Sequence, residues 1–131
     1  MDKNTSHLAG EFLVVGELAR HELAVSITFG NAKSVDIYAQ SAQNTYRVDA
    51  KALRGRSNWP VNSANIDPAV VYVFVCLGSK RDIKNNNPPQ YFIVPGSVLP
   101  SLITHWKGGR SGVTYKTLNG SKHKNDWRLF T

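Results

Sequence analysis

The sequence SVDIYAQSAQNTYRVDAKAL, residues 34–53, decides the expected fold. It contains two short runs rich in residues that favour strands, at positions 34–40 and 45–53. The residues between the two runs are small or carry amides, as turn residues usually do. The stretch therefore predicts a β-hairpin.

Two acidic residues and one lysine fall on the same face of this hairpin. A turn centred on Ala42 and Gln43 puts Asp36 opposite Asp49, with Cβ atoms about 4.5–5.5 Å apart, and Lys51 two residues further along. Directly opposed like charges destabilise a sheet, so the two carboxylates need a cation, which Lys51 or a metal ion could supply. Mg²⁺ takes oxygen ligands from one or two carboxylates and from substrate phosphates. The alternative is a solvated hairpin face with weak surface ion pairs.

A helix is expected over residues 8–20, and its apolar stripe consists of Leu8, Phe12, Val15 and Ala19. Glu11 falls on this stripe, whereas Glu17 points away from it, beside Arg20 and His21. A carboxylate on a buried face is costly unless it is paired or bound to a metal. Glu11 is therefore a candidate third acidic group, and Glu17 is expected to be solvated and paired. If the helix began near Gly10, Glu11 would instead complement the helix dipole.

The remaining pattern predicts an α/β fold with a mixed central sheet of about five strands flanked by helices. Residues 69–77 are apolar and typical of a strand buried on both faces. Further strands are expected at residues 23–28 and 91–94, a polar surface loop between Ser79 and Gln90, and a second helix capped by Ser97 that reaches Trp106. Residues 1–106 form the expected core, and residues 107–131 a basic, aromatic-containing extension of the same domain.

Length and composition limit the function classes. A chain of 131 residues is expected to form one domain. Its longest apolar run, residues 69–77, is far shorter than the roughly 20 residues that span a bilayer, and the N-terminus lacks the apolar region of a signal peptide. A cytoplasmic protein without a membrane partner is expected. The single cysteine, Cys76, is expected to be a core thiol.

The excess positive charge suits a nucleic-acid partner. The net charge is +7, and residues 105–131 hold six Lys or Arg against one acidic residue, Asp126. Basic residues interleaved with aromatic ones can bind phosphates while the aromatic rings pack or stack on bases; a solvated tail is the alternative. Trp59 is either such a platform or a core residue. The expected nucleic-acid contacts are Lys33, Arg54, Arg56, Trp59, Lys107, Arg110, Lys116, Lys122, Lys124 and Arg128.

The order of segments from residue 10 to residue 106 resembles the PD-(D/E)XK nuclease-like superfamily, in particular its small bacterial single-domain proteins related to restriction enzymes and resolvases. The segments that carry the resemblance are GEFLVVGELARHELAVSITFGNAKSVDIYAQ, YRVDAKAL, WPV, DPAVVYVFVCLG and QYFIVPGSVLPSLITHW. The family order is a Gly-Glu helix, an Asp strand, and then a strand with the catalytic lysine. Many relatives carry Gln where this chain has Asp49. The chain departs from the pattern at Val35, where the family name has Pro, and no clear helix follows Lys51.

The resemblance implies a restriction-endonuclease-like core with Asp36, Asp49, Lys51 and Glu11 as catalytic residues. It further implies that Asp36, Asp49, Glu11 and the carbonyl of Ala50 bind Mg²⁺ or Mn²⁺. The expected function is a metal-dependent endonuclease acting on DNA. Two alternatives stay open: a catalytically inactive nucleic-acid-binding accessory protein of a defence or mobile-element system, and a protein-binding regulator. A homodimer would bring two centres to two strands, but the sequence offers no interface for it.

Overall fold

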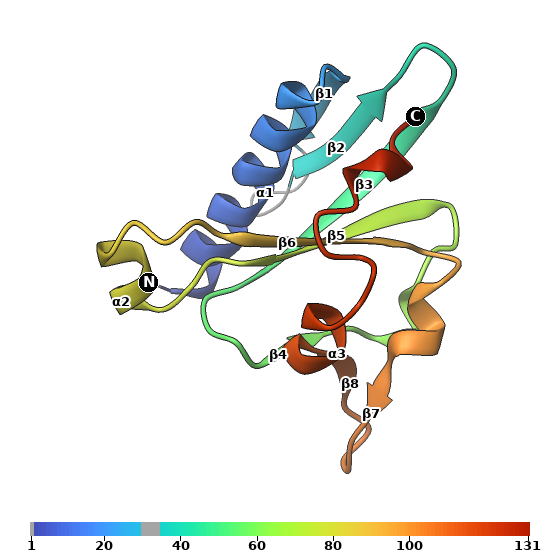
Figure 1. Cartoon of the computed structure of the whole chain (residues 1–131). Coiled ribbons are helices and arrows are strands. Elements are labelled where there is room, and N and C mark those ends of the chain that lie inside the picture. Colours follow the sequence, from blue (N-terminus) through green and yellow to red (C-terminus); the bar gives the residue numbers. More distant parts are fainter. Residues whose placement is uncertain (1, 30–34) are drawn as a thin grey trace.

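A five-stranded mixed sheet forms the centre of the computed structural model, which describes residues 2–29 and 35–131. The predicted contact residue Lys33 lies outside the described residues. Helix α1 (Lys3–Arg20) crosses one face of the sheet, and a smaller three-stranded sheet packs beyond the other (Figure 1). The predicted α/β class with a mixed central sheet is confirmed. The five central strands are β1 (Ala24–Phe29), β2 (Val35–Gln40), β3 (Thr45–Leu53), β5 (Val70–Cys76) and β6 (Gln90–Pro95).

The strand order is β1-β2-β3-β5-β6. The pairs β1–β2, β2–β3 and β5–β6 are antiparallel, whereas β3 and β5 are parallel. The predicted hairpin is confirmed, and β3 has the predicted bounds. All seven residues of β5 are buried, as expected of a central strand covered on both faces. The crossover from β3 to β5 runs through β4 (Asn58–Pro60) and the 3-10 helix η1 (Ser63–Asn65).

Helix α1 buries a different face from the predicted apolar stripe. It begins at Lys3, capped by the side chain of Asp2, and its buried residues are Ser6, Gly10, Glu11, Val14 and Leu18. Leu8 and Phe12 of the predicted stripe are 50% and 44% exposed. A Cβ atom at Gly10 would collide with the Cβ of Ala52 in β3. Because glycine alone allows this close approach, the helix turns its Gly10 face, and with it Glu11, toward the sheet.

A second core fills the other face of the sheet. Its largest residue is Trp59 of β4, which is 1% exposed, packs edge-to-face on Phe74, and donates its Nε1–H to the carbonyl of Val75 at 3.3 Å. Trp59 is therefore a core residue, and the prediction that it contacts nucleic acid is wrong for this conformation. Its strand pairs with β8 (Ser111–Thr114), which in turn pairs with β7 (Thr104–His105).

The prediction of a helix from Ser97 to Trp106 is wrong. A short 3-10 helix, η2 (Leu99–Leu102), takes its place, and the chain is extended at Ile103, with φ −76° and ψ 133°. The backbone of β7 then pairs with β8 across the turn at residues 106–110, so formation of this hairpin overrides the local helical pattern. Beyond residue 106 the chain is built into the fold, because β8 is the middle strand of the small sheet.

The polar segment between β5 and β6, predicted as a loop, contains helix α2 (Lys80–Lys84). Ser79 and Asp82 form a capping box: the Ser79 hydroxyl accepts from the Asp82 N–H, and the Asp82 carboxylate accepts from the Ser79 N–H. This reciprocal pair satisfies backbone donors that a short helix otherwise exposes to water. The helix therefore forms despite the asparagine and proline residues that follow it.

The C-terminal segment folds back against the central sheet through α3 (Tyr115–Asn119) and η3 (Trp127–Leu129). Trp127 and Phe130 are 9% and 8% exposed and pack in the same core as α1. The carbonyl of Thr131 accepts hydrogen bonds from Ser41, Asn44 and Tyr46 around the β2–β3 turn. The helices within residues 2–29 and 35–131 include none with the length and apolar character needed to cross a membrane.

Candidate functional site

Asp36 and Asp49 come from the paired strands β2 and β3. Their pairing runs from Gln40–Thr45 to Ile37–Val48, so Asp36 and Asp49 are the residues directly beyond the last pair. Ile37 and Val48 belong to the core under α1. Because side chains alternate along a strand, the two aspartates point to the opposite face.

Each aspartate has a basic neighbour on its own face. Arg47 Nη2 lies 3.7 Å from Asp36 Oδ1, and Lys51 Nζ lies 3.6 Å from Asp49 Oδ2. The aspartate side chains are 45% and 44% exposed. Ion pairs of this length between solvated groups are weak. Both carboxylates are therefore accessible and can exchange these partners for a ligand.

Glu11 comes from α1, which covers the sheet face opposite to the one toward which Asp36 and Asp49 point, and it is buried. The residue is 3% exposed, and its Oε1 lies 3.6 Å from Nε2 of His7, one helical turn earlier. Glu11, Asp36 and Asp49 all line one cleft of about 350 Å³, which we call the carboxylate cleft. The helix begins at Lys3, so the alternative role of Glu11 at a helix N-terminus near Gly10 is excluded.

Glu17 differs from Glu11 as predicted. The Arg20 Nε–H donates to Glu17 Oε2 at 2.7 Å, and this hydrogen bond lowers the pKa of Glu17 below its usual value. Glu17 is thus paired with Arg20 as predicted, but its side chain is 20% exposed and so only partly solvated.

The carboxylate cleft contains residues that sequence reasoning missed, among them Asn65, Asp67 and Tyr72. The Asp67 N–H donates to Tyr72 Oη at 2.9 Å, and the Asp67 carboxylate accepts from the Ala69 N–H at 2.9 Å. The parallel pairing of β3 with β5 brings the segment before Val70 beside Arg47. A sequence argument that recognised this parallel pair would have found Asp67.

The donor set suits a hard divalent ion, since the acidic groups of the cleft supply carboxylate oxygens. Within the described residues, no three His, Cys, Asp or Glu side chains converge closely enough to hold a metal ion. Mg²⁺ needs only one or two protein carboxylates when water and phosphate oxygens complete its shell, so the residues fit such an ion. Ala50 is 4% exposed and packs under α1, and its carbonyl remains a predicted ligand only.

Arg54 lines a basic groove on the far side of β3 from the hairpin turn. This groove of about 830 Å³ is bordered by Arg54, Lys80, Arg81, Ile83, Lys84 and Asn85. The three basic residues of α2 are exposed, and sequence reasoning missed all three because they sat in a segment taken as a loop. Four cations around one groove form a surface suited to a polyanion.

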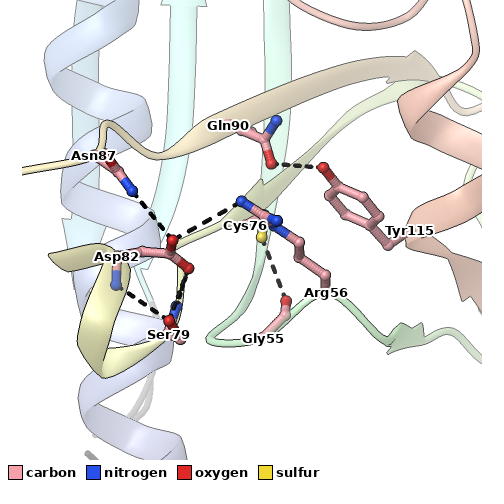
Figure 2. Close-up of polar contacts among 8 residues, drawn as sticks. All are labelled: Gly55, Arg56, Cys76, Ser79, Asp82, Asn87, Gln90 and Tyr115. Carbon is pink, nitrogen blue, oxygen red and sulfur yellow. Dashed lines mark hydrogen bonds and ion pairs between the residues drawn. The ribbon is translucent and has the colours of Figure 1, made fainter. Parts of the chain in front are cut away.

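Arg56 joins the loop after β3 to α2 (Figure 2). Its Nη2 lies 3.9 Å from Asp82 Oδ1, and its guanidinium lies 5.9 Å from the ring centre of Tyr115. The Cys76 thiol, at the end of β5, donates to the carbonyl of Gly55 in this loop at 3.3 Å. Burial raises the pKa of the Cys76 thiol. Cys76 is the expected core thiol. Arg56 is 59% exposed, so it can also reach a phosphate.

The aromatic residues of the C-terminal segment divide into two groups. Tyr115, Trp127 and Phe130 pack in the two cores, so of the two roles considered for them, packing is the one the structure supports. Trp106 is partly exposed and lines a pocket with Arg110. The other predicted phosphate contacts in this segment are exposed, namely Lys107, Lys116, Lys122, Lys124 and Arg128.

Comparison with known proteins gives no identity. A scan against protein-family models found no match to the chain, and neither did searches of curated proteins and of solved structures.

Proposed function

We propose that the protein is a metal-dependent endonuclease that hydrolyses phosphodiester bonds of DNA in the carboxylate cleft. The observation that carries the proposal is that Glu11 from α1, Asp36 from β2 and Asp49 from β3 line one cleft. The resemblance to PD-(D/E)XK nucleases assigned the same three residues, together with Lys51, to one centre.

Asp36 and Asp49 would hold Mg²⁺ or Mn²⁺, with Glu11 and the Ala50 carbonyl as predicted further ligands. A bound divalent ion supplies Lewis acidity and lowers the pKa of a coordinated water. Asp36 and Asp49 bind and orient in this scheme, and their present contacts with Arg47 and Lys51 are long enough to be exchanged.

Lys51 is the group that acts on the reacting phosphate. Its side chain is 30% exposed, and its ammonium lies 3.6 Å from Asp49 and 6.0 Å from the ring centre of Tyr72. Both neighbours line the carboxylate cleft, so the ammonium lies beside it. In an in-line displacement, the ammonium stabilises the negative charge that grows on the phosphate and orients the attacking water. Arg47, on the same face, can pair with a neighbouring phosphate once Asp36 binds the metal ion.

The basic groove beside α2 extends the surface available to DNA. Arg54 follows β3 directly, five residues after Asp49, or about 17 Å along an extended strand. One strand of B-DNA presents a phosphate about every 3.4 Å along the axis. The groove would therefore hold phosphates about five nucleotides from the bond being cut.

Metal-dependent cleavage tests the proposal. Plasmid, single-stranded and branched DNA are incubated with Mg²⁺ or Mn²⁺, and with EDTA, using wild type, Lys51→Met and the control Arg20→Met, whose arginine is exposed at the end of α1 and does not line the cleft. Wild type and Arg20→Met should cut only with the metal, and Lys51→Met should be slower by about 10²–10³-fold. Equal activity of Lys51→Met and wild type, or no cleavage of any substrate, rejects the nuclease proposal.

A second function, nucleic-acid binding without cleavage, is favoured by one observation. Within the described residues, the cleft carboxylates do not form a ready three-ligand metal group. The accessory protein expected as an alternative would bind DNA through the basic groove and the C-terminal cations, and Lys51→Met would bind as wild type does. The cleavage assay with a parallel binding assay separates the two functions.

A further inference from the structure

A pocket between β4 and the β7–β8 hairpin lies outside the carboxylate cleft. It has a volume of about 630 Å³, and the side chains that give it its chemistry are those of Asn58, Asn62, Trp106 and Arg110. We call it the tryptophan pocket. None of the described residues that line it is acidic, so it presents one aromatic ring, two carboxamides and one guanidinium.

The ring of Trp106 is held in position by the backbone around it. The Trp106 N–H and the Arg110 carbonyl close the hairpin with a 2.8 Å hydrogen bond. The turn between them uses Gly108 and Gly109 at φ +82° and +74°, a conformation that glycine adopts at little cost. A Cβ at Gly112 would approach within 3.2 Å of Trp106 Cζ3, so the ring packs over the bare glycine backbone. Trp106 is a preformed, partly exposed platform.

The polar groups around the ring match the parts of a nucleotide. Asn58 is exposed, and its carboxamide can donate and accept at a base edge. Asn62 Oδ1 already accepts from the Ala64 N–H at 3.1 Å, so Asn62 offers its amide donors. The Arg110 guanidinium can pair with a phosphate. Every base has a flat face that stacks on an aromatic ring, whatever its sequence.

The pocket is joined to the carboxylate cleft by η1. Asn62 lines the tryptophan pocket, and Asn65 lines the cleft. Three residues of 3-10 helix rise about 6 Å, so the two sites are near neighbours. We propose that the tryptophan pocket binds one unstacked base of a single-stranded or opened DNA substrate by stacking on Trp106, and so positions the strand that enters the cleft. This proposal rests on the proposed function for the identity of the polymer.

Quenching of tryptophan fluorescence by a ligand reports mainly on Trp106. Trp59 and Trp127 are 1% and 9% exposed, whereas Trp106 is more accessible. Wild type in EDTA is titrated with a short single-stranded oligonucleotide and with an abasic oligonucleotide that has the same number of phosphates. The base-containing strand should quench the fluorescence and bind more tightly. Trp106→Ala should weaken its binding by about 5- to 150-fold and leave the affinity for the abasic strand unchanged, which also shows that the variant is folded.

Trp106→Phe keeps a stacking ring, so it should lose the quenching signal while it retains most of the affinity. The proposal is overturned if wild type binds both strands equally well and both strands quench its fluorescence equally. It is also overturned if Trp106→Ala binds the base-containing strand with wild-type affinity. Binding in EDTA is independent of cleavage, because no divalent ion is present to support hydrolysis. Loss of the nuclease function and failure of the base pocket are therefore distinguishable.

Discussion

Asp82 and Asp49 are both carboxylates on the protein surface, but their surroundings differ. Asp82 accepts hydrogen bonds from the Ser79 N–H and hydroxyl, both at 2.8 Å, and from Asn87 Nδ2 at 3.2 Å, and it faces Arg56 (Figure 2). The Ser79 backbone hydrogen bond is the main cause that lowers the pKa of Asp82 to about 2. Asp49 has one ion-pair contact, at 3.6 Å, and a 44% exposed side chain.

The difference separates a structural carboxylate from one suited to ligands. A carboxylate offers about four acceptor positions. At Asp82 most of them are filled by residues of the same chain, which fixes α2 beside the loop that carries Arg56. At Asp49 the contact with Lys51 leaves acceptor positions open to water, metal or phosphate. Substitution of the first should therefore loosen the fold locally, and substitution of the second should affect function.

The largest expected effect is loss of cleavage in Asp49→Asn. The amide keeps the size of the side chain but removes the negative charge that a divalent ion needs, so cleavage should fall by about a hundredfold or more. The free energy of unfolding should stay within about 0.5 kcal/mol of wild type, because the site is solvated. Cleavage rates and thermal unfolding measured on the same preparations check both parts.

Asp126→Asn is the matched control for charge, since Asp126 pairs with the exposed Arg128 at 3.2 Å, away from the cleft. It should cut DNA at the wild-type rate. An equal loss of activity in both variants would show that net charge, and not the cleft, controls cleavage.

At the cap of α2, a substitution is expected to lower local stability and not to act on the cleavage site. Ser79→Ala removes the hydroxyl that caps the helix, and a lost N-cap typically costs about 1 kcal/mol. Amide hydrogen exchange should become faster in α2 and in the residues that follow, while the protection of β5 stays unchanged. Ser101→Ala is a control serine, because its hydroxyl donates to the carbonyl of Val98 outside α2. Uniformly faster exchange throughout the protein would contradict a local role.

Much of the central sheet is predictable because its signals are local. The strand pattern and the turn residues between Gln40 and Thr45 give the hairpin register, and with it the position of Asp36 and Asp49 directly beyond the last pair, Ile37 with Val48. The small sheet is not predictable in this way, since β7 has two residues and β4 three. β4 forms only because it pairs with β8, which is distant in the sequence, and β7 is completed by the hairpin that it forms with β8. Helix α2 did have a readable signal, the serine and the acid three residues apart at Ser79 and Asp82.

For the site, helical spacing identified Glu11 but for an incomplete reason. The predicted stripe ranked Leu8 and Phe12 above Gly10 by hydropathy, whereas the close approach of Gly10 to Ala52 selects the buried face. The hydropathy of residues does not show how closely a helix can approach a sheet. Asp67 and the basic residues of α2 were missed because their positions depend on the parallel β3–β5 crossover and on tertiary contacts of α2.

The pH dependence of α2 offers a third test of the comparison. The pKa of Asp82 is about 2 in the folded protein, below its ordinary value of 3.8. Folding thus favours the ionised form, so its stabilising contribution is complete above about pH 4 and is lost as the pH falls toward 2. Hydrogen exchange in α2 should become faster over this window, and Asp82→Asn should abolish that change. A variant that keeps the wild-type pH dependence would assign the effect to another group.

The smallest expected effect concerns single phosphate contacts in the basic groove. A plot of log affinity for duplex DNA against log salt concentration has a negative slope. Arg54→Gln and Lys84→Gln should each make that slope less steep by about 0.9, because each variant neutralises one phosphate fewer. Lys124→Gln separates the groove from the C-terminal segment, since the Lys124 ammonium contacts Asn119 Oδ1 at 3.3 Å on α3. If only Lys124→Gln changes the slope, DNA follows the C-terminal segment and not the groove. If Arg54→Gln and Lys84→Gln change the slope, DNA binds in the basic groove. If Ser79→Ala then also weakens the affinity for duplex DNA, the cap formed by Ser79 and Asp82 holds the basic residues of α2 in position for DNA.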